Sequence, residues 1–137
     1  EFQALYTQAE LDDTAALSRI VAGKNDDGSG RADSEINAIG STMSGWYVQL
    51  GYDLLAFKGD GQDERSLTPF IRFSQYNTQD SIPDGFKRSG AMDVDVTTIG
   101  VNFKPIDEIV FKADMQLYDN AAGSGVDQFN LAVGYVF

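Results

Sequence analysis

The sequence predicts an all-β protein made of about six antiparallel strands. Apolar and polar residues alternate along most of the chain, whereas helical periodicity is confined to one short segment. Polar, Gly-rich stretches separate the alternating segments, as loops separate strands. The clearest alternation is at the C-terminal end, where every second residue is large and apolar: Phe129, Leu131, Val133, Tyr135 and Phe137.

Six segments carry this alternation. We expect strands near residues 2–10, 46–55, 67–76, 94–104, 109–118 and 128–137. The last five each have one apolar face, while the faces of 2–10 cannot be assigned from the pattern. Pro69 lacks a backbone donor, so it should lie near a strand start or at a bulge.

The connections between these segments alternate in length. The first, an insert over 12–44, contains a predicted helix over 14–22, with Asp12 or Asp13 as N-cap and Gly23 after its last residue. Another long polar loop covers 77–93, whereas 105–108 is a tight connection. Such alternation is typical of outer-membrane barrels, which have short periplasmic turns and longer external loops. This predicts that the C-terminus lies on the periplasmic side.

Composition excludes several classes of function. The net charge of −11 at pH 7 argues against a nucleic-acid-binding protein. The chain has no Cys and no His, which removes thiol nucleophiles, imidazole bases and zinc sites. The acidic tracts 25–30 and 59–64 lack the spacing of an EF-hand calcium loop. We therefore expect no enzyme activity, metal or cofactor, although a glycosidase-type carboxylate pair stays open.

The predicted strands are long enough to cross a membrane when tilted. Their charges fall on the polar face, away from the apolar one, where Lys or Arg at bilayer depth costs about 2–4 kcal/mol. The candidate lumen-facing residues are Gln49, Asp53, Arg72, Asn102, Lys104, Lys112, Asp114 and Gln116. Two aromatic girdles emerge from the pattern, Trp46 and Phe129 on the external side and Phe103, Phe111, Tyr135 and Phe137 on the periplasmic side.

Alternation alone does not distinguish a membrane barrel from a soluble barrel or sandwich, in which the apolar face points inward. The polar face is rich in Gln, Asn, Thr, Tyr and Gly but poor in Lys and Glu, unlike a typical soluble exterior. This composition favours the membrane barrel.

The C-terminal segment NLAVGYVF, 130–137, resembles the last strand of bacterial outer-membrane proteins, with Ala132 where that pattern prefers Gly. This resemblance implies an assembly signal, read by the barrel-assembly machinery, formed by Leu131, Val133, Tyr135 and Phe137. The segments GWYVQLGY (45–52), LTPFIRFSQY (67–76), TTIGVNFKP (97–105) and 110–114 resemble the phosphate-selective porin family and related general porins.

Such porins are large, often sixteen-stranded and trimeric barrels in the outer membrane of Gram-negative bacteria. The resemblance therefore implies contact with the lipid bilayer and lipopolysaccharide, a homotrimer, and an all-β transmembrane barrel of which this chain forms the C-terminal six strands. Six strands cannot close a porin. The chain is then either part of a longer polypeptide or one of several chains in a shared barrel.

The expected function is a porin-like channel for passive diffusion of small hydrophilic solutes or ions. The mixed charges on the polar face favour general diffusion over a dedicated phosphate filter, which needs a ladder of Arg or Lys. Two alternatives stay open: an outer-membrane barrel that acts as a scaffold or adhesin-like binding protein, and a soluble ligand-binding β-barrel.

Overall fold

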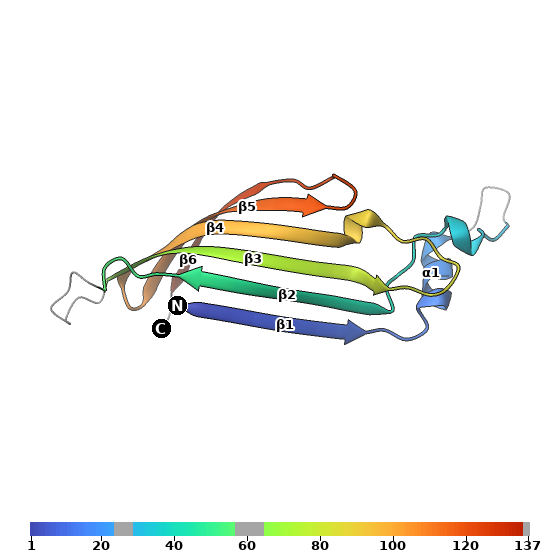
Figure 1. The fold of residues 1–137 in the computed structure, drawn as a ribbon, viewed down its shortest axis with the longest axis horizontal. Coiled ribbons are helices and arrows are strands. Elements are labelled where there is room, and N and C mark those ends of the chain that lie inside the picture. Colours follow the sequence, from blue (N-terminus) through green and yellow to red (C-terminus); the bar gives the residue numbers. More distant parts are fainter. Residues whose placement is uncertain (24–28, 57–64, 136–137) are drawn as a thin grey trace.

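The chain folds into a single antiparallel sheet. The structure is a computed structural model and describes residues 1–23, 29–56 and 65–135. Its strands are β1 (Phe2–Glu10), β2 (Thr42–Gly51), β3 (Ser66–Ser81), β4 (Asp93–Ile106), β5 (Ile109–Asn120) and β6 (Gln128–Tyr135). They pair in sequence order from β1 to β6, so the sheet is open and β1 and β6 form its edges (Figure 1).

Helical structure is limited in the described chain. α1 (Thr14–Ala22) follows β1, η1 (Asp33–Glu35) precedes β2, and η2 (Gly90–Met92) precedes β4. Figure 1 shows α1 beyond the end of β1, at the same end of the sheet as the connections from β3 to β4 and from β5 to β6. The ranges 52–65 and 107–108 connect strands at the opposite end.

The strand register places apolar side chains on one face and polar ones on the other. In the row that crosses the middle of the sheet, Leu50 pairs with Ile71, Ile71 with Ile99, and Ile99 with Met115. One residue along, Gln49 pairs with Arg72, and Arg72 with Thr98. The pairing also assigns the faces of β1, because Phe2, Ala4 and Tyr6 lie beside Leu50, Val48 and Trp46.

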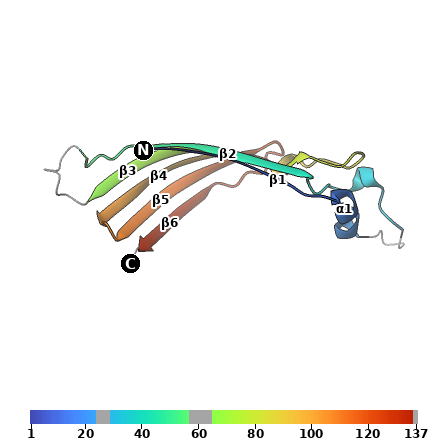
Figure 2. The same cartoon turned by 90° about the horizontal axis from the view of Figure 1, so that it is seen from below.

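The sheet is strongly curved, with β6 turned well away from the plane of β1 and β2 (Figure 2). On the polar face Gln49, Thr98 and Asp114 are about 95% buried, although no second layer covers them. On the apolar face Leu131 is 73% exposed. Because curvature crowds side chains on the inside of a sheet and spreads them on the outside, the polar face is the concave one.

Several expected boundaries differ from the observed ones. β2 begins at Thr42 instead of 46 and ends at Gly51, short of 55, so the connection before it ends at residue 41 and not at 44. β3 extends to Ser81, beyond the expected 76. Alternation marks only the part of a strand whose two faces differ, whereas backbone pairing continues past the apolar band. Residues 57–64 and 136–137, including Phe137, lie outside the described residues, as do most of the tracts 25–30 and 59–64.

Pro69 lies near the start of β3, as its missing donor requires. The backbone N–H of Tyr52 donates to the Pro69 carbonyl at 3.1 Å, so the side of Pro69 that lacks an N–H faces Tyr52, just past the last residue of β2. The proline therefore interrupts the ladder only where β2 has already ended.

The predicted helix over 14–22 coincides with α1. Asp13 is its N-cap residue but has a left-handed backbone, φ 55°, and its side chain makes no capping hydrogen bond. Gly23, at φ 69°, ends the helix, and its N–H donates to the Ile20 carbonyl at 3.3 Å. The termination signal was correct, whereas the side-chain capping expected at the start does not occur.

Gly100 allows the buried ring of Phe70 to cross the concave face. A Cβ at Gly100 would lie 2.6 Å from Phe70 Cζ and 2.7 Å from both the Ala113 carbonyl oxygen and Asp114 Cβ. Phe70 and Gly100 are direct cross-strand partners, so the missing side chain of one gives room to the large side chain of the other.

Gly100→Ala is expected to lower the free energy of unfolding by about 1–3 kcal/mol, because the added methyl group overpacks against backbone as well as side chain. The measurement is urea unfolding followed by circular dichroism in a membrane-mimetic detergent. Gly30→Ala is the matched control, because a Cβ there meets nothing within 4 Å. Equal effects of the two substitutions would contradict this account of Gly100.

Candidate functional site: the polar concave face

The predicted lumen-facing residues come together on the concave face. They occupy successive rows of the ladder: Gln49 with Arg72 and Gln116, Asp114 in the next row, then Asn102 with Lys112, and Lys104 last. Asp53 follows β2, and its Oδ1 accepts hydrogen bonds from the N–H groups of Leu55 and Leu67 at 3.0 and 3.1 Å. It therefore holds the connection between β2 and β3 at this end of the face.

Arg72 is fixed in the middle of the polar face by uncharged groups. Its Nε donates to Gln49 Oε1 at 2.9 Å, and its guanidinium lies 4.5 Å from the centre of the Tyr47 ring. Neither of these two contacts brings a carboxylate to the guanidinium, so its positive charge is not balanced by an ion pair there. The Arg72 side chain thus contributes a fixed cation to the wall.

Asp114 is the centre of a second cluster. Its side chain is 4% exposed; Lys112 Nζ lies 3.2 Å from one of its carboxylate oxygens, and Asn130 Nδ2 donates to the other at 3.0 Å. The same Lys112 ammonium lies 5.2 Å from the Phe70 ring centre. Asn130 is on β6, so this cluster ties three strands together on the polar face.

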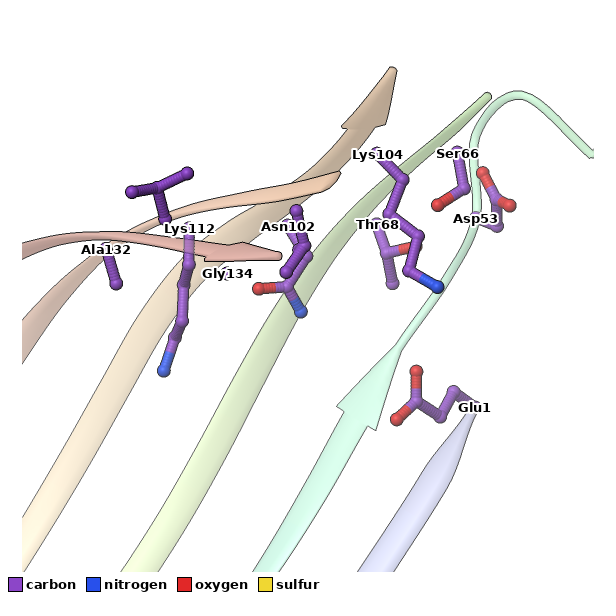
Figure 3. A pocket seen from close by; sticks show the side chains of 11 residues that line it. Glu1, Asp53, Ser66, Thr68, Asn102, Lys104, Lys112, Ala132 and Gly134 are labelled. Atoms are coloured by element: carbon purple, nitrogen blue, oxygen red, sulfur yellow. The ribbon is translucent and has the colours of Figure 1, made fainter. Parts of the chain in front are cut away.

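A hollow of about 570 Å³ opens on the polar face near the connection from β4 to β5. Figure 3 shows Lys112, Asn102 and Thr68 on neighbouring strands along its wall, with Lys104 beside Thr68 and Asp53 beyond it. Its lining carries ammonium, carboxylate, hydroxyl and amide groups together. Such a lining offers both hydrogen-bond donors and hydrogen-bond acceptors.

The predicted girdle residues lie on the opposite, convex face. Phe103 and Phe111 are direct partners, and Tyr135 pairs with Ile109 at the same end. Trp46 pairs with Tyr6 toward the other end, and Trp46 Nε1 donates to Gln75 Oε1 at 3.1 Å. Phe129 is 67% exposed opposite Met115. Tyr6, Phe2 and Tyr52 add further aromatic residues to this face. The sequence pattern did not reveal Tyr6 and Phe2, because the faces of β1 could not be assigned from it.

At the end of the sheet opposite the hollow, two connections fold into one compact unit, here called the loop cap and formed by α1, residues 31–41 and residues 79–89. Lys87 pairs with the first connection through two backbone hydrogen bonds, from the Ala38 N–H to the Lys87 carbonyl and from the Lys87 N–H to the Ile36 carbonyl, at 2.9 and 3.0 Å. The buried Gln79 amide bonds both Ala38 and Ser89. The loop cap is therefore a folded element with its own buried residues.

Sequence reasoning did not find the residues that build the loop cap. Ser18 is 1% exposed and Gln79 is 3% exposed, yet both are polar residues in segments whose pattern indicates loop, helix surface or strand end. Gly40 was the available signal: a Cβ there would lie 2.1 Å from the Thr78 carbonyl oxygen, so only glycine permits this close approach.

Other kinds of site are not apparent in the part of the chain that the structure describes. No group of three or more metal-ligating side chains occurs among residues 1–23, 29–56 and 65–135. Over the same residues, no helix is both long and apolar enough to span a bilayer.

Comparison with known proteins finds a distant relative. A protein of Aquifex aeolicus (strain VF5), described as uncharacterized, is 26% identical over 104 residues, which cover 76% of this chain and 23% of that protein. The chain therefore spans less than a quarter of the length of the relative it matches. No family model matches the sequence, and no solved structure matches it.

Asp114→Ala is expected to lower the free energy of unfolding by about 1–3 kcal/mol, because it leaves Asn130 and the partly exposed Lys112 without their acceptor on the concave face. Denaturant unfolding measures this loss. Asp119→Ala, on the exposed face of the same strand, is the control and is expected to change stability by less than about 0.5 kcal/mol. A small effect at Asp114 would show that the cluster does not stabilise the sheet.

In the loop cap, the hydrogen bonds from Arg19 hold the pKa of the Asp33 carboxyl below its ordinary value of 3.8. A lowered pKa means that the ion pair stabilises the cap at and above ordinary carboxyl pKa values and is lost as the pH falls through the lowered one. NMR titration of the Asp33 carboxyl carbon measures this. We expect Arg19→Ala to return the pKa to its ordinary value and Arg19→Lys, which cannot bind bidentately, to return it in part. An unchanged titration in Arg19→Ala would contradict the assignment.

Proposed function

We propose that this chain forms part of the wall of an outer-membrane β-barrel that acts as a porin-like channel for passive diffusion of small hydrophilic solutes or ions. The observation that carries the proposal is the direction of curvature, with the polar face concave and the apolar face convex. A soluble ligand-binding barrel needs the reverse, because its apolar face must be inside. Closing a sheet with this curvature puts water-compatible groups in the lumen and apolar groups outside.

The convex aromatic residues support a membrane boundary on each side. Trp46 lies in the row of Gln75, whereas Phe129 lies in the row of Leu50, four residues further along β2. The aromatic line at the other end of the strands shifts by the same amount. Tyr52 lies in the row of Ala113, whereas Tyr135 lies in the row of Ile109, four residues away along β5. Both lines therefore advance by about one residue per strand in the same direction.

This common shift corresponds to a strand tilt of about 35°, for strands about 4.8 Å apart and residues about 3.3 Å apart. Transmembrane barrels tilt their strands by about 35–45°. At that tilt, the outward apolar run of β5 from Ile109 to Leu117 covers about 22 Å of height. The apolar band of such barrels is about 25 Å tall.

Charged residues on the convex face lie outside the same two aromatic lines. Between the two aromatic lines, the described convex positions carry no Asp, Glu, Lys or Arg. Asp95 and Asp119 are partners on this face and lie in the row of Trp46. Because the aromatic line shifts by about one residue per strand, this row already lies outside the apolar band at β4 and β5. Glu10 likewise lies beyond Tyr6. An apolar band bordered by aromatic and then charged residues fits hydrocarbon bordered by headgroups.

The remaining strands must come from outside these six, since even the smallest single-chain barrels have about eight. The rest of a longer polypeptide, or further copies of the chain in one shared barrel, can supply them. A homotrimer, as in porins, would then consist of complete barrels. In the proposed orientation β6 ends on the periplasmic side, and the loop cap lies outside the cell. The convex face then contacts the lipid bilayer and, on its external side, lipopolysaccharide. Leu131, Val133 and Tyr135 serve as the signal to the barrel-assembly machinery.

A scaffold or adhesin-like role is the second candidate, and the loop cap favours it. A connection folded around buried Ser18 and Gln79 presents a fixed external surface, which a binding protein uses and a simple pore does not need. The two candidates differ in whether the closed barrel has an open lumen.

Full-length protein purified from membranes is expected to give stepwise, salt-dependent currents in planar lipid bilayers. Arg72→Glu should shift the reversal potential in a salt gradient toward cation preference, because it reverses a fixed charge on the concave face. Arg88→Glu makes the same charge change in the loop cap, off the concave wall, and should produce a smaller shift. Folded, inserted protein that carries no current would reject the channel and leave the scaffold role.

A further inference from the structure

Helix α1 turns its polar side toward the protein and its apolar side toward solvent. Thr14 and Ser18, one helical turn apart, are 4% and 1% exposed. Leu17 and Ile20, which lie away from that side, are 38% and 75% exposed. A surface helix ordinarily has the opposite arrangement, with its apolar stripe against the core. The exposed apolar side therefore needs an explanation other than packing within the cap.

Polar contacts hold the helix firmly in this orientation. The Ile39 N–H donates to Ser18 Oγ at 2.8 Å, and Ser18 Oγ donates to the Thr14 carbonyl at 2.6 Å. Arg19 binds both carboxylate oxygens of Asp33, at 2.8 and 2.6 Å, and its guanidinium lies 5.3 Å from the Phe86 ring centre. Contacts to both other segments of the loop cap, residues 31–41 and 79–89, thus fix the rotation of α1 about its axis.

The helix is placed where the polar face ends. Figure 2 shows α1 past the end of β1 and displaced from the strands toward the concave side, with η1 and the connection from β3 to β4 above it. Since its polar side contacts residue 39, the apolar side faces away from that part of the cap. In a closed barrel the concave side beyond the strand ends is the entrance to the lumen.

We propose that Leu17 and Ile20 form an apolar constriction at the external mouth of the channel and determine which solutes enter it. The inference rests on the proposed channel function and adds residues that the polar wall does not contain. A narrow apolar passage disfavours water and strongly hydrated ions, because it replaces none of their hydrogen bonds. Entry then favours small and weakly hydrated solutes, and the wetted wall below conducts whatever passes.

The first test uses the full-length protein in a cysteine-free background; the sequence of this chain contains no cysteine. Ile20→Cys is modified with methanethiosulfonate ethyltrimethylammonium while current is recorded across a planar bilayer. We expect the current to fall by about half or more, because a bulky cation then occupies the constriction. Val126→Cys is the control: Val126 is 72% exposed and lies in the connection from β5 to β6, outside the loop cap. Its modification should leave the current unchanged.

The second test enlarges the constriction. Replacing Leu17 and Ile20 together by Ser is expected to raise single-channel conductance and to speed the entry of larger sugars into proteoliposomes, whereas Val126→Ser changes neither. Arg19 and Ser18 are left intact so that the helix keeps its anchors.

The outcomes separate the two proposals. Currents that are insensitive to both the thiol reagent and the Ser replacements would overturn the constriction and leave the channel intact. If the thiol introduced by Ile20→Cys does not react, protein covers this side of α1, which also overturns the constriction. Unmodified wild-type protein that carries no current would reject the proposed channel, and the constriction with it.

Discussion

The unbroken antiparallel ladder from β1 to β6 is the constraint on which the rest of the structure depends. Each strand pairs with the next in sequence, so every side chain's face is fixed by the register of its neighbours. A slip of one residue in any pair would move an entire set of apolar side chains to the polar face. Three features oppose such a slip: the two-residue connection 107–108, the packing of Gly100 against Phe70, and the Asp114 cluster that reaches β6.

The same register links local pairing to a property of the whole sheet. The offset between aromatic positions is not visible in any single pair, but it appears when distant strands are compared through the ladder. Trp46 and Phe129 are four strands apart, and their offset agrees with that of Tyr52 and Tyr135. Two independent sets of residues thus give one direction and one size of shift, which supports the strand tilt of the proposed barrel.

Much of the fold was predictable because its signals are local. Alternation located all six strands, and the cap and stop residues located α1 at its observed bounds. The faces of the polar residues Arg72, Lys112 and Asp114 followed from parity along each strand. The direction of curvature did not follow, because alternation is identical for a sheet that bends either way. The loop cap was also hidden, since the hydrogen bonds of Gln79 and Ser18 connect segments far apart in sequence and no local pattern encodes them.

The uncovered edges of β1 and β6 have a consequence for how the chain behaves outside its assembled form. Each edge presents a row of unpaired backbone donors and acceptors, beside a convex face on which Phe2, Leu131 and Val133 are about 70% exposed. Such an edge is a template for adding strands from any neighbouring molecule. In water, the six strands by themselves would therefore be prone to edge-to-edge aggregation, so a polypeptide that carries them needs both edges paired or covered soon after synthesis.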